Sequence, residues 1–131
     1  MFNKRKQPPI KSLIAHGSHI SGNVKFTDGL RIDGTLVGDI HANEDQPSIL
    51  VVSESASVTG ALHADHIIIS GNVKGPVHAN LMLELQPKAR VEGDVHYRAL
   101  EMHQGATISG QLHPMITGEA KPTLKLAANN K

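Results

Sequence analysis

Five histidines occupy one position of a repeated motif, and they are the residues of this chain whose type and spacing could support chemistry. They are His41, His63, His78, His96 and His113. If the repeats stack at the spacing of hydrogen-bonded strands, about 4.8 Å, these side chains form a continuous column. The residues on either side of each histidine have the opposite parity and are expected to face inward. We therefore expect this histidine column on the outside of the molecule.

Three interpretations of the histidine column are open. The simplest is a solvated face on which histidine replaces the lysine found at Lys25. The second is pH sensing, because neighbouring imidazolium ions would repel one another near about pH 6. The third is binding of zinc, nickel or copper by neutral imidazoles. No carboxylate accompanies the column at a fixed position, so we expect no catalytic metal site, and we predict no cofactor.

The motif that carries the histidines occurs six times and predicts a repeat protein. It reads glycine, any residue, an aliphatic residue, a basic residue, then a small, aromatic or proline residue. Its glycines are Gly22, Gly38, Gly60, Gly75, Gly93 and Gly110. The longest interval contains a polar insert from Asn43 to Ser48, which predicts a surface loop. One repeat is therefore a coil of about 15 to 18 residues.

Apolar residues alternate with polar ones in short runs bounded by turn-forming residues, which predicts strands. Such strands cannot form a stable sheet alone, but stacked coils can enclose a shared apolar interior. The pattern therefore predicts an all-β protein, a parallel β-helix. The chain of 131 residues has one tyrosine, two phenylalanines and no tryptophan. We expect a narrow interior without room for large rings.

Charge and composition indicate one domain with basic ends. Residues 18–117 carry six basic and eleven acidic side chains, whereas residues 1–17 carry four basic side chains and no acidic one. The chain has no cysteine, which excludes disulfides and thiolate metal sites. It also has no apolar run of about 18 residues, so neither a membrane span nor a signal peptide is predicted.

Three short sequence segments, together with the coil spacing, resemble those of the bactofilins, which are polymer-forming bacterial cytoskeletal proteins. The segments are Ser12 to Ile14, Gly29 to Gly34 and Ala89 to Asp94. The resemblance implies a right-handed, three-faced β-helix that assembles end to end into filaments without polarity or nucleotide. It also implies a cytoplasmic scaffold for cell-wall or envelope machinery at the inner membrane. We expect a basic membrane-targeting tail (1–11), the β-helix domain (12–116) and a disordered tail (117–131).

Both ends of the predicted rod are apolar, which favours polymerisation because open strand edges pair with other chains. One predicted interface consists of Leu13, Ile14 and Ile20, and the other of Ile108, Leu112 and Met115. Like ends that pair with each other would generate a filament without direction. The alternative is that Pro114 and the polar tail cap the last coil, leaving a monomer or a closed dimer.

The N-terminal segment resembles the membrane-targeting segment of many bactofilins. The residues predicted to contact an anionic membrane surface are Met1, Phe2, Lys4, Arg5 and Lys6. An aromatic ring beside basic residues suits the headgroup region of such a surface. The simpler alternative is a disordered, solubilising start.

The enzymatic alternative is an acyltransferase of the left-handed hexapeptide type, with His66 or His103 as general base. That fold requires an aliphatic residue at every sixth position, whereas the aliphatic residues of this chain alternate. Neither histidine has a recognisable partner in the sequence. The chain also lacks a nucleotide-binding GxxxxGK[ST] motif, and an acidic rod with few aromatics is a poor nucleic-acid binder. We therefore predict a structural protein without catalytic residues.

Overall fold

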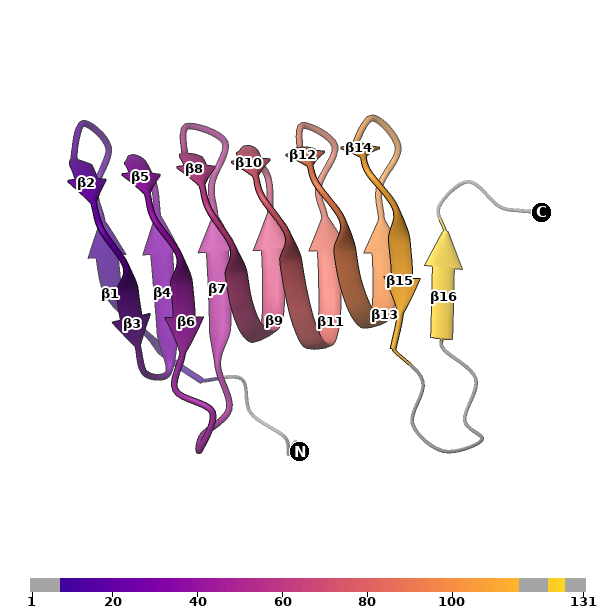
Figure 1. Ribbon diagram of the computed structural model, residues 1–131, viewed down its shortest axis with the longest axis horizontal. Coiled ribbons are helices and arrows are strands. Elements are labelled where there is room, and N and C mark those ends of the chain that lie inside the picture. Colours follow the sequence, from indigo (N-terminus) through magenta and orange to yellow (C-terminus); the bar gives the residue numbers. More distant parts are fainter. Residues whose placement is uncertain (1–7, 116–122, 127–131) are drawn as a thin grey trace.

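The computed structural model describes residues 8–115 and 123–126, which form a parallel β-solenoid without any helix (Figure 1). Strands of successive coils pair in parallel throughout. One wall is a six-stranded sheet, so the described residues form six coils. Each of the first two coils contributes one strand to each of three walls. The predicted all-β, three-faced β-helix is therefore confirmed. None of the described residues belongs to a helix that could cross a membrane.

Each coil contributes one strand, or one half of a long strand, to each wall. The first wall contains β1 (Ile10–Ile14), β4 (Gly29–Ile32), β7 (Ile49–Val52) and β16 (Thr123–Leu126). The second contains β2 (His19–Ser21), β5 (Thr35–Val37), β8 (Ser57–Thr59), β10 (Asn72–Lys74), β12 (Arg90–Glu92) and β14 (Thr107–Ser109). The third contains β3 (Val24–Phe26), β6 (Ile40–Ala42) and β15 (Leu112–Pro114). Three long strands turn the corner between the third and first walls: β9 (Leu62–Ile69), β11 (Val77–Leu85) and β13 (Val95–Met102).

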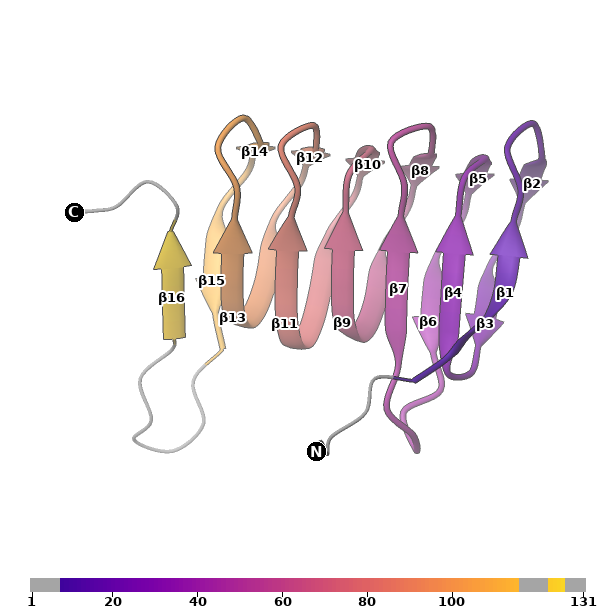
Figure 2. The same cartoon turned by 180° about the vertical axis from the view of Figure 1, so that it is seen from behind.

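The coils are right-handed, as the resemblance implied. In Figure 1 the chain rises along the far wall in β1, descends along the near wall in β3, and advances from left to right. Figure 2 shows the reverse side, with β1, β4 and β7 now nearest the viewer. This handedness differs from that of the left-handed acyltransferase fold considered as an alternative.

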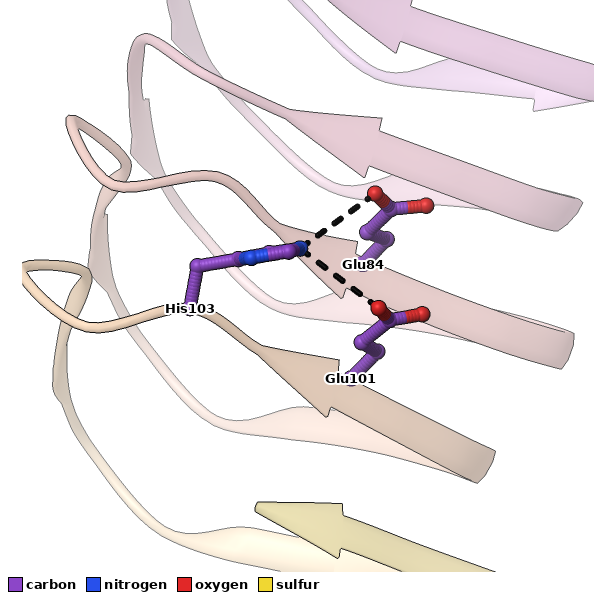
Figure 3. Close-up of side chains that lie close together, drawn as sticks. All are labelled: Glu84, Glu101 and His103. Carbon is purple, nitrogen blue, oxygen red and sulfur yellow. Dashed lines mark ion pairs between the residues drawn. The ribbon is translucent and has the colours of Figure 1, made fainter. Parts of the chain in front are cut away.

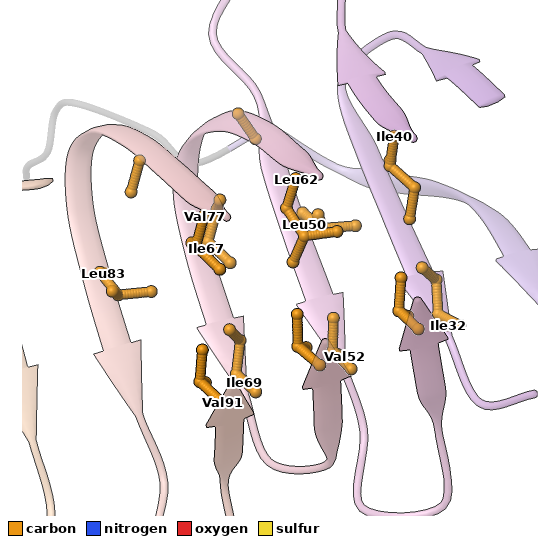
Figure 4. Close-up of a cluster of buried hydrophobic side chains, with 14 of the residues drawn as sticks. Ile32, Ile40, Leu50, Val52, Leu62, Ile67, Ile69, Val77, Leu83 and Val91 are labelled. Carbon is orange, nitrogen blue, oxygen red and sulfur yellow. The ribbon is translucent and has the colours of Figure 1, made fainter. Parts of the chain in front are cut away.

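The interior consists of columns of aliphatic side chains that run along the solenoid (Figure 4). Within one coil, Ile32, Leu36 and Ile40 come from three different walls, and all three side chains are fully buried. Burial of each such side chain stabilises the fold by about 1.5 to 3 kcal/mol. Because each coil buries its apolar residues against its neighbours, the stack folds as one unit.

Large rings do enter this interior, so the expectation that it has no room for them is wrong. Tyr97 is fully buried and Phe26 is buried. Both occupy the column that contains Ala42 and Ala79, which are their register partners in the adjacent coils. An alanine in the neighbouring coil leaves volume that a ring can fill.

The repeated glycine and the residue after it join successive coils at one corner. Gly60 has a φ of 147°, and a Cβ atom added to it would overlap the carbonyl oxygen of Gly38 in the preceding coil. The Asn23 side chain accepts a hydrogen bond from the Asp39 backbone N–H (2.9 Å), and the Asp39 side chain accepts one from the Ala61 N–H (2.9 Å). Glycine at this corner therefore permits close stacking, and the adjacent side chains satisfy backbone donors.

Candidate functional site: the solenoid ends, the histidine column and a side-chain cluster

The first coil leaves one edge of each of its three strands without a partner among the described residues. Strand β1 pairs with β4, β2 with β5, and β3 with β6. Ile20 and Val24 belong to interior columns but are only half-buried, whereas their register partners Leu36 and Ile40 are fully buried. The N-terminal end therefore presents the open ends of two apolar columns.

The last coil shows the same arrangement on two walls. Leu112 is in register with Val95, yet its side chain is 45% exposed whereas Val95 is fully buried. Ile108 continues the interior column of Val91 and is half-buried. Met115 follows β15, where its backbone N–H donates a hydrogen bond of 2.6 Å to the Tyr97 carbonyl. The C-terminal end is therefore apolar and partly exposed on these two walls.

Strand β16 extends the first wall beyond β13. Its residues Thr123–Leu126 pair in parallel with Ala99 to Met102. This strand lies within the segment 117–131, for which a disordered tail was expected. The structure describes only these four residues of the segment, so the disordered tail remains a prediction. Polar and apolar residues do alternate along β16, but over too short a run to predict a strand without knowledge of the open β13 edge.

Four of the six predicted interface residues lie on interior columns that reach an end of the solenoid. These are Ile14, Ile20, Ile108 and Leu112. Leu13 instead occupies an outward position in register with the exposed Arg31, and its own side chain is 58% exposed. The interface itself remains a prediction.

The predicted membrane-contacting residues lie outside the residues that the structure describes. They are Met1, Phe2, Lys4, Arg5 and Lys6. Their role also remains a prediction.

The histidine column is continuous and half-buried, and it faces outward as expected. Backbone register aligns its members from His41 to His113 along the third wall. Adjacent imidazole rings stack with centroids 4.1 to 4.6 Å apart and planes within 12° of parallel. The column is therefore a packed ladder of rings rather than a set of separate solvated side chains.

Packing lowers the pKa of two central members of the column below the usual 6.5. Burial is the main cause at His63, and the nearby His41 lowers the pKa further, whereas Asp39 and Glu44 act in the opposite direction. Burial likewise lowers the pKa of His78, with additional effects of its histidine neighbours. Within the described structure, the buried Nδ1 atom of His63 has no hydrogen-bond partner. These features favour neutral imidazoles in the middle of the column.

One carboxylate does accompany the column, at its C-terminal end. An Asp94 side-chain oxygen lies 3.3 Å from Nε2 of His113, and the other side-chain oxygen accepts a hydrogen bond of 3.0 Å from the Gln111 backbone N–H. The backbone hydrogen bond is the main cause of the lowered pKa of Asp94, and His113 lowers it further. Because this contact is made by one member, it does not supply a carboxylate at a fixed position of the column.

The stacked geometry does not favour a metal ion shared between neighbouring members of the column. The lone pair of an imidazole nitrogen lies in the plane of its ring. Because neighbouring rings are nearly parallel, their lone pairs run side by side and do not converge on one point.

A separate cluster lies on the first wall, where Glu84 and Glu101 are directly opposed in register on β11 and β13. Nε2 of His103 lies 3.5 Å from a Glu84 carboxylate oxygen and 3.6 Å from a Glu101 oxygen (Figure 3). Nε2 of His66 lies 4.0 Å from the other oxygen of Glu84. Burial is the main cause of the lowered pKa of His66, while both glutamates act in the opposite direction. The structure thus supplies carboxylate partners for the two histidines considered above as possible bases.

Sequence reasoning missed the two glutamates of this cluster. The signal that could have found them is their separation of 17 residues, which equals one coil and places them side by side. His103 lies two residues beyond Glu101, where the chain turns towards the next wall. From this position its ring points towards both carboxylates.

Comparison with known proteins gives one consistent result. Residues 12–113 match the sequence model of a family described as bactofilin, polymer-forming cytoskeletal. A relative, bactofilin BacO of Myxococcus xanthus (strain DK1622), is 27% identical over 111 residues, a stretch that covers 85% of each chain. No solved structure gave a significant match.

Proposed function

The chain belongs to the bactofilin family of polymer-forming cytoskeletal proteins, and we propose that it assembles end to end into filaments without polarity and without nucleotide. The observation that carries this proposal is the exposure of Leu112. Its position belongs to a column whose member Val95 is fully buried, yet its own side chain is 45% exposed, and among the described residues no strand pairs with β15 on the side away from β13. Covering such apolar surface is favourable, at roughly 25 cal/mol for each Å² removed from water.

The two ends supply different surfaces, and the proposed filament pairs like with like. One contact joins two N-terminal ends through Ile14 and Ile20, with Leu13 at its outer margin. The other joins two C-terminal ends through Ile108, Leu112 and Met115. Each contact is then two-fold symmetric, and two such contacts on one rod produce an open filament with no direction.

Electron microscopy of the purified chain in nucleotide-free buffer tests this proposal. We expect filaments for the unaltered chain and none for Leu112→Glu or Met115→Glu, because a charge buried between two ends is strongly unfavourable. The matched control is Leu81→Glu, which changes a leucine of β11 that is 55% exposed and lies away from both ends. Persistence of filaments in both end variants, or their loss in the Leu81 variant, would refute the assigned interface.

We further propose that the filament lies at the cytoplasmic face of the bacterial inner membrane. Phe2 would insert among the headgroups while Lys4, Arg5 and Lys6 attract anionic lipids, each basic residue contributing about 1 kcal/mol. A single copy binds weakly, but a filament presents many copies at once.

Flotation with phosphatidylglycerol vesicles in a density gradient tests this attachment, because filaments alone do not float. We expect deletion of residues 2–6 to abolish flotation with the vesicles while filaments persist. The Leu112→Glu variant, which keeps the basic segment, is expected to bind more weakly than filaments do. Equal vesicle binding with and without residues 2–6 would exclude this segment as the anchor.

In this proposal the filament has a structural role, as a scaffold for cell shape or for envelope and cell-wall machinery, and it is not an enzyme. The support is the polymer-forming family and the acidic surface of the solenoid between basic terminal segments. A hexapeptide acyltransferase is disfavoured by the right-handed coil. An assay of acetyl-coenzyme A turnover on the purified filament should give no activity above that of buffer.

A further inference from the structure

We propose that Glu84, Glu101 and His103 form a binding site for a divalent transition-metal ion such as Zn²⁺, which links the adjacent coils that contain β11 and β13. One ligand atom from each of these side chains lies within 4.8 Å of the other two. The three ligands comprise two carboxylates and one imidazole, which are common zinc ligands. Figure 3 shows the imidazole directed between the two carboxylates.

The distances within the cluster suit metal ligands better than hydrogen bonds. A hydrogen bond from an imidazole N–H to a carboxylate spans about 2.7 to 3.2 Å, whereas Nε2 of His103 lies 3.5 and 3.6 Å from its two carboxylate oxygens. Ligand bonds of about 2.0 to 2.2 Å at tetrahedral angles place neighbouring ligand atoms roughly 3.4 Å apart. The two distances from His103 are therefore close to the spacing of tetrahedral zinc ligands, and the two carboxylate oxygens lie within 4.8 Å of each other, so that rotation of the glutamate side chains can bring all three ligand atoms around one ion.

The environment of the donor atoms is consistent with this geometry. Nε2 of His103 is buried and makes no hydrogen bond within the described structure, although the residue as a whole is half-buried. The side-chain amide of Gln86 donates a hydrogen bond to a Glu84 carboxylate oxygen. Such an outer hydrogen bond orients a ligand carboxylate, as partners of metal ligands commonly do.

Electrostatics supply the reason for a bound cation. Glu84 and Glu101 occupy directly opposed positions of neighbouring parallel strands, where like charges destabilise the pairing. A divalent cation between the two carboxylates neutralises both at once, whereas each of the nearby histidines, His66 and His103, supplies at most one positive charge. The side chain of Glu101 is 43% exposed, so water can occupy the fourth position of the ion.

The ligand set also selects the class of metal. Mg²⁺ and Ca²⁺ prefer all-oxygen sites with six or more ligands, whereas an imidazole nitrogen favours zinc, nickel, copper or cobalt. Because the ligands come from neighbouring coils, the ion would connect the last two long strands near the C-terminal end. The predicted role is therefore structural reinforcement of this end.

Isothermal titration of the metal-free full chain with ZnCl₂ tests the site. The titration is repeated for Glu101→Gln, His103→Asn and the matched control His113→Asn. His113 is the appropriate control because it is also a half-buried histidine beside a carboxylate, but it lies on the third wall. We expect one zinc ion per chain at this site, a loss of affinity of at least about 100-fold in the first two variants, and no loss in the control.

Spectroscopy of the unaltered chain with CoCl₂ provides a test that does not depend on the folding of a variant. We expect the intense visible absorption of tetrahedral Co²⁺, which disappears when one equivalent of ZnCl₂ displaces the cobalt. Absence of zinc binding, equal binding in all variants, or a loss in the His113 variant alone would overturn the proposal. So would a site that binds MgCl₂ or CaCl₂ as tightly as ZnCl₂.

Discussion

The imidazole rings of His63 and His78 stack face to face, with centroids 4.4 Å apart and planes 3° from parallel. Burial lowers the pKa of both side chains from the usual 6.5, and each neighbouring histidine adds to the effect at His78. Their neutral forms are therefore the ones that the folded solenoid accommodates.

We expect the free energy of unfolding to fall as the pH decreases below about 6.5. A histidine with a lower pKa in the folded chain binds fewer protons there than in the unfolded chain. The stability that His63 and His78 contribute is thus fully present above the unfolded value of 6.5 and is lost as the pH falls through their lower folded-state values. Asp39 and Glu44 reduce this effect at His63 but do not reverse it.

Thermal unfolding followed by circular dichroism at a series of pH values measures this dependence. The double variant His63→Asn and His78→Asn is expected to show a weaker decline than the unaltered chain. The control is His19→Asn, which changes an exposed histidine of β2 outside the column. An unchanged pH dependence in the double variant would show that other groups cause the decline.

The close approach of successive coils predicts that Gly60→Ala is strongly destabilising. The added Cβ would overlap the Gly38 carbonyl oxygen, so the two coils would have to separate. The control is Gly22→Ala, at the same motif position of the first coil. Gly22 also has a positive φ, of 128°, but a Cβ there meets no atom within 4 Å. Both variants carry backbone strain, so their difference isolates the contact between coils.

We expect Gly60→Ala to lower the free energy of unfolding by about 2 kcal/mol more than Gly22→Ala does. Urea denaturation measures both values. Equal destabilisation by the two substitutions would mean that backbone strain alone explains the requirement for glycine at position 60.

Ile67 and Ile68 provide a test of the alternation that builds the walls. Ile67 is fully buried in the interior, whereas its neighbour Ile68 faces outward and is half-buried. We expect Ile67→Ala to cost about 2 to 5 kcal/mol, because it leaves a cavity in a packed column. Ile68→Ala should cost about 1 kcal/mol or less. Similar losses in urea denaturation would contradict the assigned faces of β9.

Strand β16 covers the edge of β13 on the first wall, and its removal should promote association. Truncation of residues 117–131 would leave Ala99 to Met102 paired with β11 alone and would open their other edge. An open strand edge recruits strands from other chains, so we expect polymerisation to begin at a lower protein concentration. Sedimentation over a concentration series measures the threshold. Truncation of residues 127–131 alone retains β16 and should leave the threshold unchanged, and an equal threshold in both truncated chains would exclude the proposed covering role.

Local patterns in the sequence were sufficient to predict the walls and the histidine column. Strand pairs such as Leu36 with Val58 and His63 with His78 follow from alternation and from the recurring glycine. The polar insert from Asn43 to Ser48 is a loop between β6 and β7, as predicted. These features depend on neighbouring residues in the chain and on a regular repeat, and both can be recognised in the amino-acid sequence.

Features that depend on contacts between adjacent coils could not be predicted from local sequence patterns. The burial of Tyr97 depends on the small Ala79 in the adjacent coil. The pairing of β16 depends on an edge of β13 that only the folded solenoid leaves open. Leu13 was assigned to an end from its hydrophobicity, but the register of β1 places it on the outer face.

The sequence by itself thus determined a repeating, three-walled rod with an apolar interior and an outward ladder of histidines. The reason is that side-chain parity and turn residues are local properties that every coil repeats. Only the tertiary structure decided which outward side chains meet, as Glu84, Glu101 and His103 do, and how far the rings of the column overlap. Those contacts depend on register and side-chain direction between coils, which small differences in coil length shift.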